Sequence, residues 1–269
     1  MTPRLAWVWQ CPACGFLAST LPSGAGTGVD GLESLRRENY EVILGRLDVR
    51  LPLAGARLLE VGCARGWFME AVRARAGRPH GIEPERANAE RCAAAGLSVE
   101  CGFFPADLVD RGPFEAVVFN DVFEHLPDPA EAVCAVEELL RPGGFAVFNV
   151  PSSRGALFRI ATLLVRVGVM GPLERLWQKE FASPHISYFS PANLRLLVER
   201  HSAMRLVEVF PLPATSRRGL RSRIGRSDAR LREWVMFAAA WSLTFLLPWL
   251  PSDIAVLVFR RSDVPRSVS

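Results

Sequence analysis

The chain has 269 residues, of which 49% are hydrophobic and 22% are charged, so it can bury a substantial core and wholesale disorder is excluded. Its length fits one large α/β domain with additions. The formal net charge of +4 is too small to indicate a nucleic-acid-binding protein on its own.

The first 30 residues contain Cys11-Pro-Ala-Cys14-Gly, followed by a Gly- and Ser-rich stretch that is typical of a linker. No apolar run near the N-terminus is long enough for an export signal, so we expect a cytoplasmic protein with free thiols. The cysteine pair resembles half of a zinc site, but a structural zinc ion needs four ligands and no second pair is present. We therefore expect no bound metal. The pair is either a remnant or one knuckle of a zinc ribbon that lacks its other knuckle.

A helical pattern covers residues 31–50 and ends before Pro52, so we assign 31–54 to an N-terminal helix. Strands and helices alternate from residue 55 to the C-terminus, which predicts right-handed βαβ units and a mostly parallel sheet. The predicted strands are 56–61, 79–83, 97–101, 114–120, 145–150, 204–210 and 253–261. The predicted helices are 66–77, 84–96, 129–144 and 190–201.

Two insertions interrupt this pattern, at 152–183 and 211–252. In the first, the apolar segment 157–177 carries Arg159 and Arg166 on one helical face, because they are seven residues apart. The second joins an arginine cluster at 217–232 to the segment 234–252, which has no charge and is long enough to span a bilayer. The strand at 253–261 must return to the sheet, however, and a single spanning helix would prevent that.

Two interpretations of the second insertion remain open. The segment can lie at a membrane surface, with arginines on lipid head groups and Trp234, Trp241 and Trp249 near the boundary. Alternatively, it is a buried helix or the face of a homodimer beside a solvated basic loop.

The most specific motif is LLEVGCARGWF at 58–68, an apolar strand that leads through a glycine-containing turn into a helix. Gly62 and Gly66 allow a tight turn and a close approach to a ligand, and Glu60 places a carboxylate where it can receive an ammonium group. A dinucleotide fingerprint would require glycine at Trp67, so an oxidoreductase is disfavoured. Glu83 ends the next strand, where it can accept both hydroxyls of a ribose or act as a solvated loop acid.

Together with GIEP (81–84), FEAVVFNDVFEHLPDP (114–129), LLRPGGFAVFNVP (139–151) and HISYFSPANLRLLVERH (185–201), this motif resembles class I S-adenosylmethionine-dependent methyltransferases. The likeness is to the broad group that includes the ubiquinone-biosynthesis O-methyltransferases. It implies a Rossmann-like, seven-stranded, mostly parallel sheet with helices on both faces, and S-adenosylmethionine as cofactor.

The same resemblance implies which residues hold the cofactor. Residues expected around it are Glu60, Gly62, Ala64, Gly66, Glu83, Pro84, Phe103, Phe104, Asn120, Asp121 and Val122. The family usually has glycine where this chain has Ala64, a mild departure because alanine adds only a methyl group. It also usually has an acid that contacts adenine. Here the acid is missing or displaced to Asp107, and Phe103 or Phe104 stacks on the base instead.

His125 and His185 are the candidate general bases for a hydroxyl acceptor. Each has a structural alternative, because His125 can order its loop and His185 can be an ordinary loop residue. The apolar insertions and the resemblance favour O-methylation of a small, hydrophobic or lipid-linked acceptor at or near a membrane surface, and not of nucleic acid. The rival interpretations are a catalytically inactive binding module of the same fold and a membrane-associated scaffold.

Overall fold

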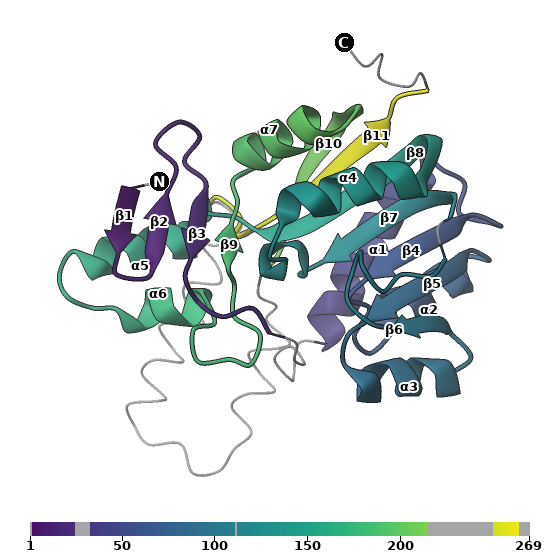
Figure 1. Cartoon of the computed structure of the whole chain (residues 1–269), viewed down its shortest axis with the longest axis horizontal. Helices are drawn as coiled ribbons and strands as arrows, with labels where there is room; N and C mark the ends of the chain where they lie inside the picture. The colour runs from purple at the N-terminus through teal and green to yellow at the C-terminus, as the bar shows by residue number, and fades with distance from the viewer. Residues whose placement is uncertain (1, 25–32, 111, 215–249, 264–269) are drawn as a thin grey trace.

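A computed structural model describes residues 2–24, 33–110, 112–214 and 250–263. Its centre is a seven-stranded sheet in the order β10-β11-β8-β7-β4-β5-β6, with helices on both sides (Figure 1). The parallel strands are β4 (Arg57–Val61), β5 (Arg78–Glu83), β6 (Ser98–Cys101), β7 (Phe114–Asn120) and β8 (Leu140–Pro151). β11 (Ile254–Arg261) runs antiparallel between β8 and β10 (Met204–Leu212). This confirms the predicted fold class and the return of the last strand to the sheet.

Each face of the sheet buries its own apolar core. The helices α1 (Glu33–Asp48) and α2 (Trp67–Ala74) cover one face, where Leu44 and Phe68 pack against strand residues. The helices α4 (Pro129–Leu139) and α7 (Pro191–His201) cover the other, where Val133 and Leu194 are fully buried. α3 (Arg86–Ala94) packs against β5 and β6. Burial on both faces explains why the central strands are apolar runs without polar alternation.

Local sequence signals determine several helix ends. Ser190 caps α7: its hydroxyl accepts from the Asn193 backbone N–H at 3.3 Å, and its own N–H donates to Asn193 Oδ1 at 2.8 Å. The predicted helix over 129–144 was wrong at its C-terminal end, since α4 stops at Leu139 and Leu140 pairs with Phe114 in the sheet. Pro142 is the physical reason, because the residue before a proline is forced away from helical geometry.

A second, four-stranded sheet was not predicted from the sequence. β1 (Thr2–Leu5), β2 (Val8–Gln10) and β3 (Leu17–Ser19) pair in succession, and β3 also pairs with β9 (Ser187–Tyr188). The N-terminal segment is thereby attached to the chain directly before α7. Its strands have only two to four residues each, too few to give a periodic pattern in the sequence.

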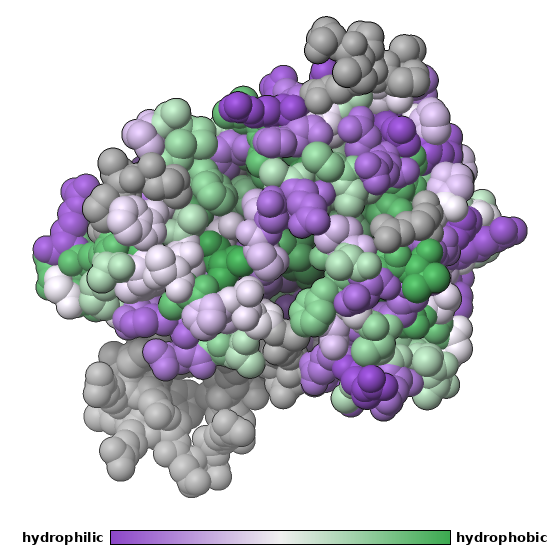
Figure 2. All heavy atoms as spheres, viewed as in Figure 1, coloured by the Kyte–Doolittle hydropathy of each residue, from purple (hydrophilic) through white to green (hydrophobic). Residues whose placement is uncertain are grey.

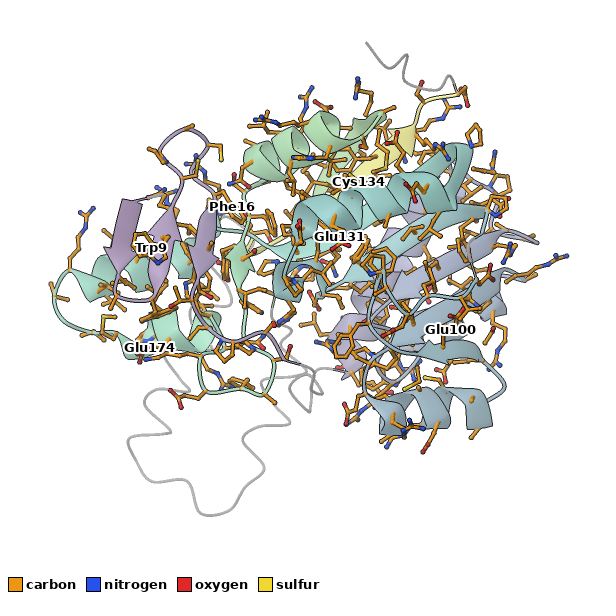
Figure 3. The ribbon with its side chains drawn as sticks, viewed as in Figure 1. Trp9, Phe16, Glu100, Glu131, Cys134 and Glu174 are labelled. Atoms are coloured by element: carbon orange, nitrogen blue, oxygen red, sulfur yellow. The ribbon has the colours of Figure 1, made fainter. Side chains whose placement is uncertain are left out.

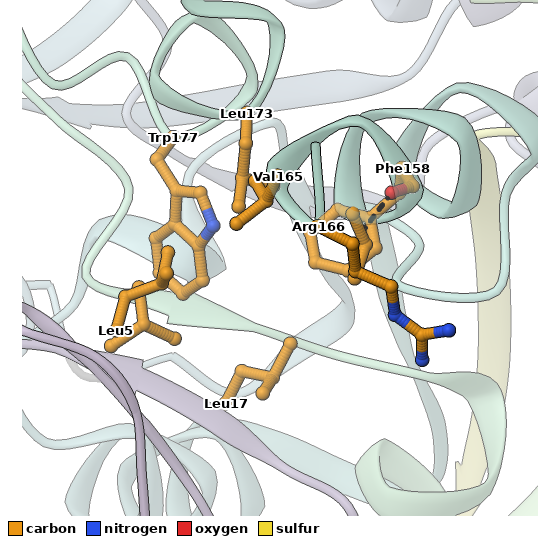
Figure 4. A pocket seen from close by; sticks show the side chains of 9 residues that line it. Leu5, Leu17, Phe158, Val165, Arg166, Leu173 and Trp177 are labelled. Carbon is orange, nitrogen blue, oxygen red and sulfur yellow. Dashed lines mark hydrogen bonds between the residues drawn. The ribbon is translucent and has the colours of Figure 1, made fainter. Parts of the chain in front are cut away.

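The small sheet rests on the first insertion, which forms α5 (Ala156–Val165) and α6 (Gly171–Leu176). Figure 4 shows Leu5 and Leu17 facing Leu173 and Trp177 across an apolar cavity of about 220 Å³. Trp177 is fully buried, and Trp7 packs edge-on against it with ring centroids 5.6 Å apart. The first insertion therefore packs against the small sheet and shares an apolar core with it.

Within the described residues, no helix is long and apolar enough to cross a membrane. The arginine cluster at 217–232 and the tryptophans Trp234, Trp241 and Trp249 lie outside these residues, so both interpretations of the second insertion stay predictions.

Candidate functional site

A cavity of about 560 Å³ lies at the carboxyl ends of β4, β5 and β7, where ligands gather in open α/β sheets. Ten of the residues predicted for the site line it, namely Gly62, Ala64, Glu83, Pro84, Phe103, Phe104, Asn120, Asp121, Val122 and His125. Figure 2 shows the face of the molecule hollowed near its middle, between the small sheet and the main sheet. Glu60, Gly66 and His185 lie outside the lining.

The turn after β4 has the left-handed backbone that the motif suggested. Gly62, Ala64 and Gly66 have φ angles of 68°, 45° and 76°. The departure at Ala64 is therefore larger than its added methyl group implied, because an L-residue is strained in this conformation. Gly66 has a packing role: a Cβ atom there would lie 2.9 Å from the Cys92 sulfur.

Glu83 holds this turn in place. One carboxylate oxygen accepts from the Ala64 backbone N–H at 2.8 Å, and the other accepts from the Glu85 N–H at 3.0 Å. Burial raises the pKa of Glu83, although these two N–H groups oppose the rise. The carboxylate retains unused lone pairs at the cavity wall, where it can accept hydroxyl groups.

Glu60 is buried on β4 and contacts the cavity wall through Asn120. Asn120 Nδ2 donates to Glu60 Oε1 at 2.9 Å. Burial raises the pKa of Glu60 to about 8. Glu60 Oε2 and Asn120 Oδ1 are both buried and have no hydrogen-bond partner among the described residues. Two buried oxygens without partners indicate that a polar ligand group completes this part of the site, and an ammonium group there would favour the ionised form of Glu60.

Arg36 and Tyr40 also reach the cavity, from α1, and were not predicted from the sequence. The Arg36 guanidinium lies 3.7 Å from the Asp121 carboxylate, and its side chain is 24% exposed. Of the arginines in the described residues, Arg36 is the one that lines this cavity. The available signal was positional: Arg36 and Tyr40 are four residues apart and therefore share one face of the predicted helix.

Two aromatic residues follow β6. Phe103 lines the cavity and remains 59% exposed, which is unusual for phenylalanine and leaves a ring free to stack on a ligand. Phe104 packs edge-on against Phe119 with ring centroids 5.6 Å apart. Asp107, the proposed displaced acid, does not line the cavity, and its carboxylate accepts from the Phe103 N–H at 2.8 Å.

His125 faces the cavity with a defined tautomer. Its Nδ1 lies 2.8 Å from the Pro184 carbonyl oxygen, and a carbonyl only accepts, so Nδ1 carries the proton. Ser183 Oγ, 3.2 Å from Nδ1, donates in turn to the Gly24 carbonyl. The other ring nitrogen, Nε2, is therefore a base. Burial lowers the pKa of His125, which keeps the ring neutral at physiological pH.

His185 is placed behind His125, with ring centroids 4.8 Å apart, and it is buried. Burial, followed by the nearby His125, lowers its pKa to about 3. Its Nε2 lies 3.8 Å from Glu124 Oε1, and burial raises the pKa of Glu124 far above its usual range. Ligand atoms of Glu124, His125 and His185 lie within 4.8 Å of one another and could hold a metal ion. The prediction of no metal, and that of a catalytic His185, stay predictions.

The remaining wall comes from outside the main sheet. Ser23 and Gly24 follow the small sheet, and Gln178, Phe181 and Ser183 precede β9. These two segments touch, since the Ser183 hydroxyl donates to the Gly24 carbonyl at 2.9 Å. The segments that follow β3 and precede β9 thus form one part of the cavity wall.

Comparison with known proteins identifies the family. Residues 24–201 match the model of a methyltransferase domain. A ubiquinone biosynthesis O-methyltransferase from Xylella fastidiosa is 28% identical over 199 residues, which cover 71% of this chain and 75% of the relative. A protein of the same name from Xanthomonas oryzae is 31% identical over 129 residues, 45% of this chain, and the match spans about half (54%) of that relative.

Solved structures agree on the fold. Magnesium protoporphyrin IX methyltransferase from Synechocystis, with bound S-adenosylhomocysteine, superposes with a TM-score of 0.55 at 11% identity, over 89% of this chain and 90% of that one. Phosphoethanolamine N-methyltransferase 2 from Haemonchus contortus, in complex with S-adenosylmethionine, gives 0.53 at 15% identity, over 84% and 53%. The family match, the curated relatives and the shared fold lead to one conclusion: the chain belongs to the methyltransferase-domain family and is an S-adenosylmethionine-dependent methyltransferase.

Proposed function

We propose that this methyltransferase acts on a hydroxyl group of a small, hydrophobic or lipid-linked acceptor. The observation that carries the proposal is His125, a neutral base of fixed tautomer in the wall of the cofactor-sized cavity. The relatives named as O-methyltransferases of ubiquinone biosynthesis support the choice of oxygen.

The described residues fit S-adenosylmethionine by their charges and unused acceptors. Arg36 would pair with the amino-acid carboxylate, and Asn120 with Glu60 would receive the ammonium group. Glu83 would accept the ribose hydroxyls, and Phe103 would stack on adenine. Bound there, the cofactor supplies an electrophilic methyl group on a sulfonium, so the protein's principal contribution is to align the acceptor with it.

His125 would take the proton of the acceptor hydroxyl at Nε2. The Pro184 carbonyl fixes the ring for this role, because it holds the proton on Nδ1 and orients the plane. Leu126 and Phe181, which also line the cavity, would hold the acceptor and exclude water from it. A group with this role should be dispensable for cofactor binding and needed for turnover.

A panel of matched acceptors tests the proposal. Purified protein, labelled S-adenosylmethionine and either an alkyl-tailed phenol, its tail-less parent or the corresponding aniline would be incubated, and the product identified by mass spectrometry. We expect O-methylation of the tailed phenol at the highest kcat/KM. Preference for the aniline would refute oxygen specificity, and equal rates on both phenols would refute the hydrophobic acceptor.

We also propose that the protein associates with a membrane surface through α5 and the residues after it. Ile160, Leu163 and Val167 follow helical spacing and are 43%, 57% and 74% exposed, and the exposed Arg159 and Arg166 flank them. Flotation with anionic liposomes tests this. Leu163→Glu should weaken binding, whereas Leu196→Glu, at an equally exposed position on α7, should not. If both variants bind the liposomes as the wild type does, the surface formed by α5 and the residues after it does not contact the membrane.

A further inference from the structure

Two buried thiols lie in contact beneath the turn that follows β4. Cys63 belongs to this turn and Cys92 to α3, and they pack with Met69 and Leu97 in an apolar cluster of their own. The Cys63 thiol donates a hydrogen bond to the Cys92 sulfur. A disulfide holds its sulfurs about 2 Å apart, closer than two thiols that share a hydrogen bond. Its formation would therefore need only a small movement, and would pull the turn and α3 together.

Cys92 also supports the strained part of the turn. Its thiol donates to the Ala64 carbonyl oxygen at 3.4 Å, while Glu83 accepts from the Ala64 N–H at 2.8 Å. Ala64 has a φ of 45°, so side chains from α3 and β5 hold both polar groups of a residue in a left-handed conformation. A disulfide has no S–H group. Oxidation of Cys92 therefore removes one of the two bonds that keep this residue in place.

The pair can be reached from the cofactor cavity. Cys63 lines the cavity of about 560 Å³, whereas Cys92 is buried behind it. All six cysteines lie within the described residues, and Cys63 is the one found in this lining. A small oxidant that enters the cavity of the ligand-free protein therefore meets this sulfur first. Bound S-adenosylmethionine would occupy the same space and shield it.

The contact between the sulfurs also makes one of them the better nucleophile. The hydrogen bond from Cys63 lowers the pKa of the Cys92 thiol, although burial opposes the change. The same hydrogen bond, followed by burial, raises the pKa of the Cys63 thiol. When the pair loses a proton, Cys92 carries the negative charge and Cys63 keeps its hydrogen. A thiolate next to a second sulfur is the arrangement from which disulfides form.

We propose that Cys63 and Cys92 form a peroxide-sensitive switch, in which a disulfide between them displaces the turn at residues 62–66 and weakens S-adenosylmethionine binding. Hydrogen peroxide transfers one oxygen to one sulfur of the pair, giving a sulfenic acid and one water. The other sulfur then attacks, the S–O bond breaks, the S–S bond forms and a second water leaves. Two thiols are oxidised and one peroxide is reduced to two waters. The switch acts on the cofactor site and does not depend on the acceptor.

Oxidation of the reduced, full-length, ligand-free protein with hydrogen peroxide tests the proposal. Mass spectrometry of peptides digested without reduction locates the disulfide. Calorimetry measures S-adenosylmethionine binding before oxidation, after it, and after addition of a thiol reductant. We expect a Cys63–Cys92 disulfide, binding that is about tenfold weaker, and recovery with reductant. S-adenosylhomocysteine added before the peroxide should slow the reaction, because it fills the cavity beside Cys63.

Variants connect the loss of affinity to this pair. Cys92→Ser keeps a hydroxyl donor for the Ala64 carbonyl but cannot form the disulfide, so peroxide should not change its affinity. Cys101→Ser and Cys134→Ser remove exposed thiols on β6 and on α4, where Figure 3 labels Cys134, and should respond to peroxide as the wild type does. Each variant is compared with its own reduced form, so a change in basal affinity does not affect the comparison.

Thermal unfolding shows whether the oxidised protein is still folded. A Cys63–Cys92 disulfide that leaves binding unchanged would overturn the proposal, and so would an oxidised protein that has unfolded as a whole. The proposal is also wrong if both thiols stay reduced while Cys101 and Cys134 are oxidised, or if peroxide weakens binding by Cys92→Ser as much as by the wild type.

Discussion

The buried carboxyl of Glu60 should make the ligand-free protein less stable as the pH rises, and Glu60→Gln should remove this effect. Burial raises the pKa of Glu60 from 4.5 to about 8. The folded state therefore holds a proton that the unfolded chain has lost, so the free energy of unfolding falls between these two pKa values and levels off above the higher one. At about 1.4 kcal/mol per pH unit, the full cost approaches about 5 kcal/mol as an upper limit.

Urea unfolding of wild type and Glu60→Gln at about pH 5.5 and about pH 9 measures the effect. Glutamine has nearly the same shape, and its carbonyl can still accept from Asn120 Nδ2. The lower pH is already above the unfolded-state pKa of 4.5, so part of the loss of stability has occurred there. Between the lower and the higher pH, the free energy of unfolding of the wild type should therefore fall by about 3 kcal/mol more than that of the variant. Other titrating groups, including the buried Glu124, are common to both proteins and cancel in the difference.

Glu90→Gln is the matched control, since Glu90 is exposed on α3 and the substitution removes one carboxylate without changing the cavity. It should follow the wild-type pH dependence. If Glu60→Gln also parallels the wild type, then Glu60 is ionised in the folded protein at neutral pH and the inference from its burial is wrong.

Three further substitutions test other parts of the site. Arg36→Met should weaken S-adenosylmethionine binding about 10- to 100-fold in calorimetry, because a charge-assisted bond contributes about 1.5–3 kcal/mol. Arg37→Met, which changes an exposed pair with Glu33, should not, and equal effects would contradict the role of Arg36. His125→Gln should lower kcat by about 10²–10⁴-fold with cofactor affinity retained, and unchanged turnover would exclude His125 as the base. Burial lowers the pKa of His125 from its ordinary value of 6.5. Wild-type kcat should therefore be constant above pH 6.5 and fall only at lower pH, when Nε2 becomes protonated. Ala64→Gly should raise the stability by about 1 kcal/mol in urea unfolding, as the left-handed backbone no longer strains a Cβ, and a loss of stability would show that the turn tolerates alanine.

The main sheet was predictable because its central strands β4, β7 and β8 are apolar and turn signals mark where strands and helices alternate. The strand predicted at 114–120 matches β7, and Ser190-Pro191 marks the start of α7. The error at 129–144 arose where helix and strand follow each other without a loop, so apolar content alone gave no boundary. The small sheet depends on pairing between residues 17–18 and 187–188, which are far apart in sequence and leave no periodic pattern.

The candidate site was predictable where residues follow the ends of strands. Gly62, Glu83 and Asn120 could be placed because the carboxyl ends of parallel strands share one edge. Arg36 could not be identified this way, since it reaches the cavity from a helix that precedes the sheet. The strain at Ala64 was also hidden, because a sequence shows the size of a side chain but not the backbone angle at which it is held.

The cavity wall has two parts of separate origin, and the pairing of β3 with β9 holds the segments of the second part together. The loops of the main sheet supply the turn at Gly62 and the carboxylate of Glu83, whereas residues 23–24 and 178–183 supply another part of the wall and are joined by the hydrogen bond from Ser183 to Gly24. Sequence drift in this second part can therefore change which molecules fit without disturbing the turn. Exchange of residues 2–24 together with 152–189 between relatives is the corresponding engineering step, because neither segment keeps its β-pairing partner if it is transplanted alone.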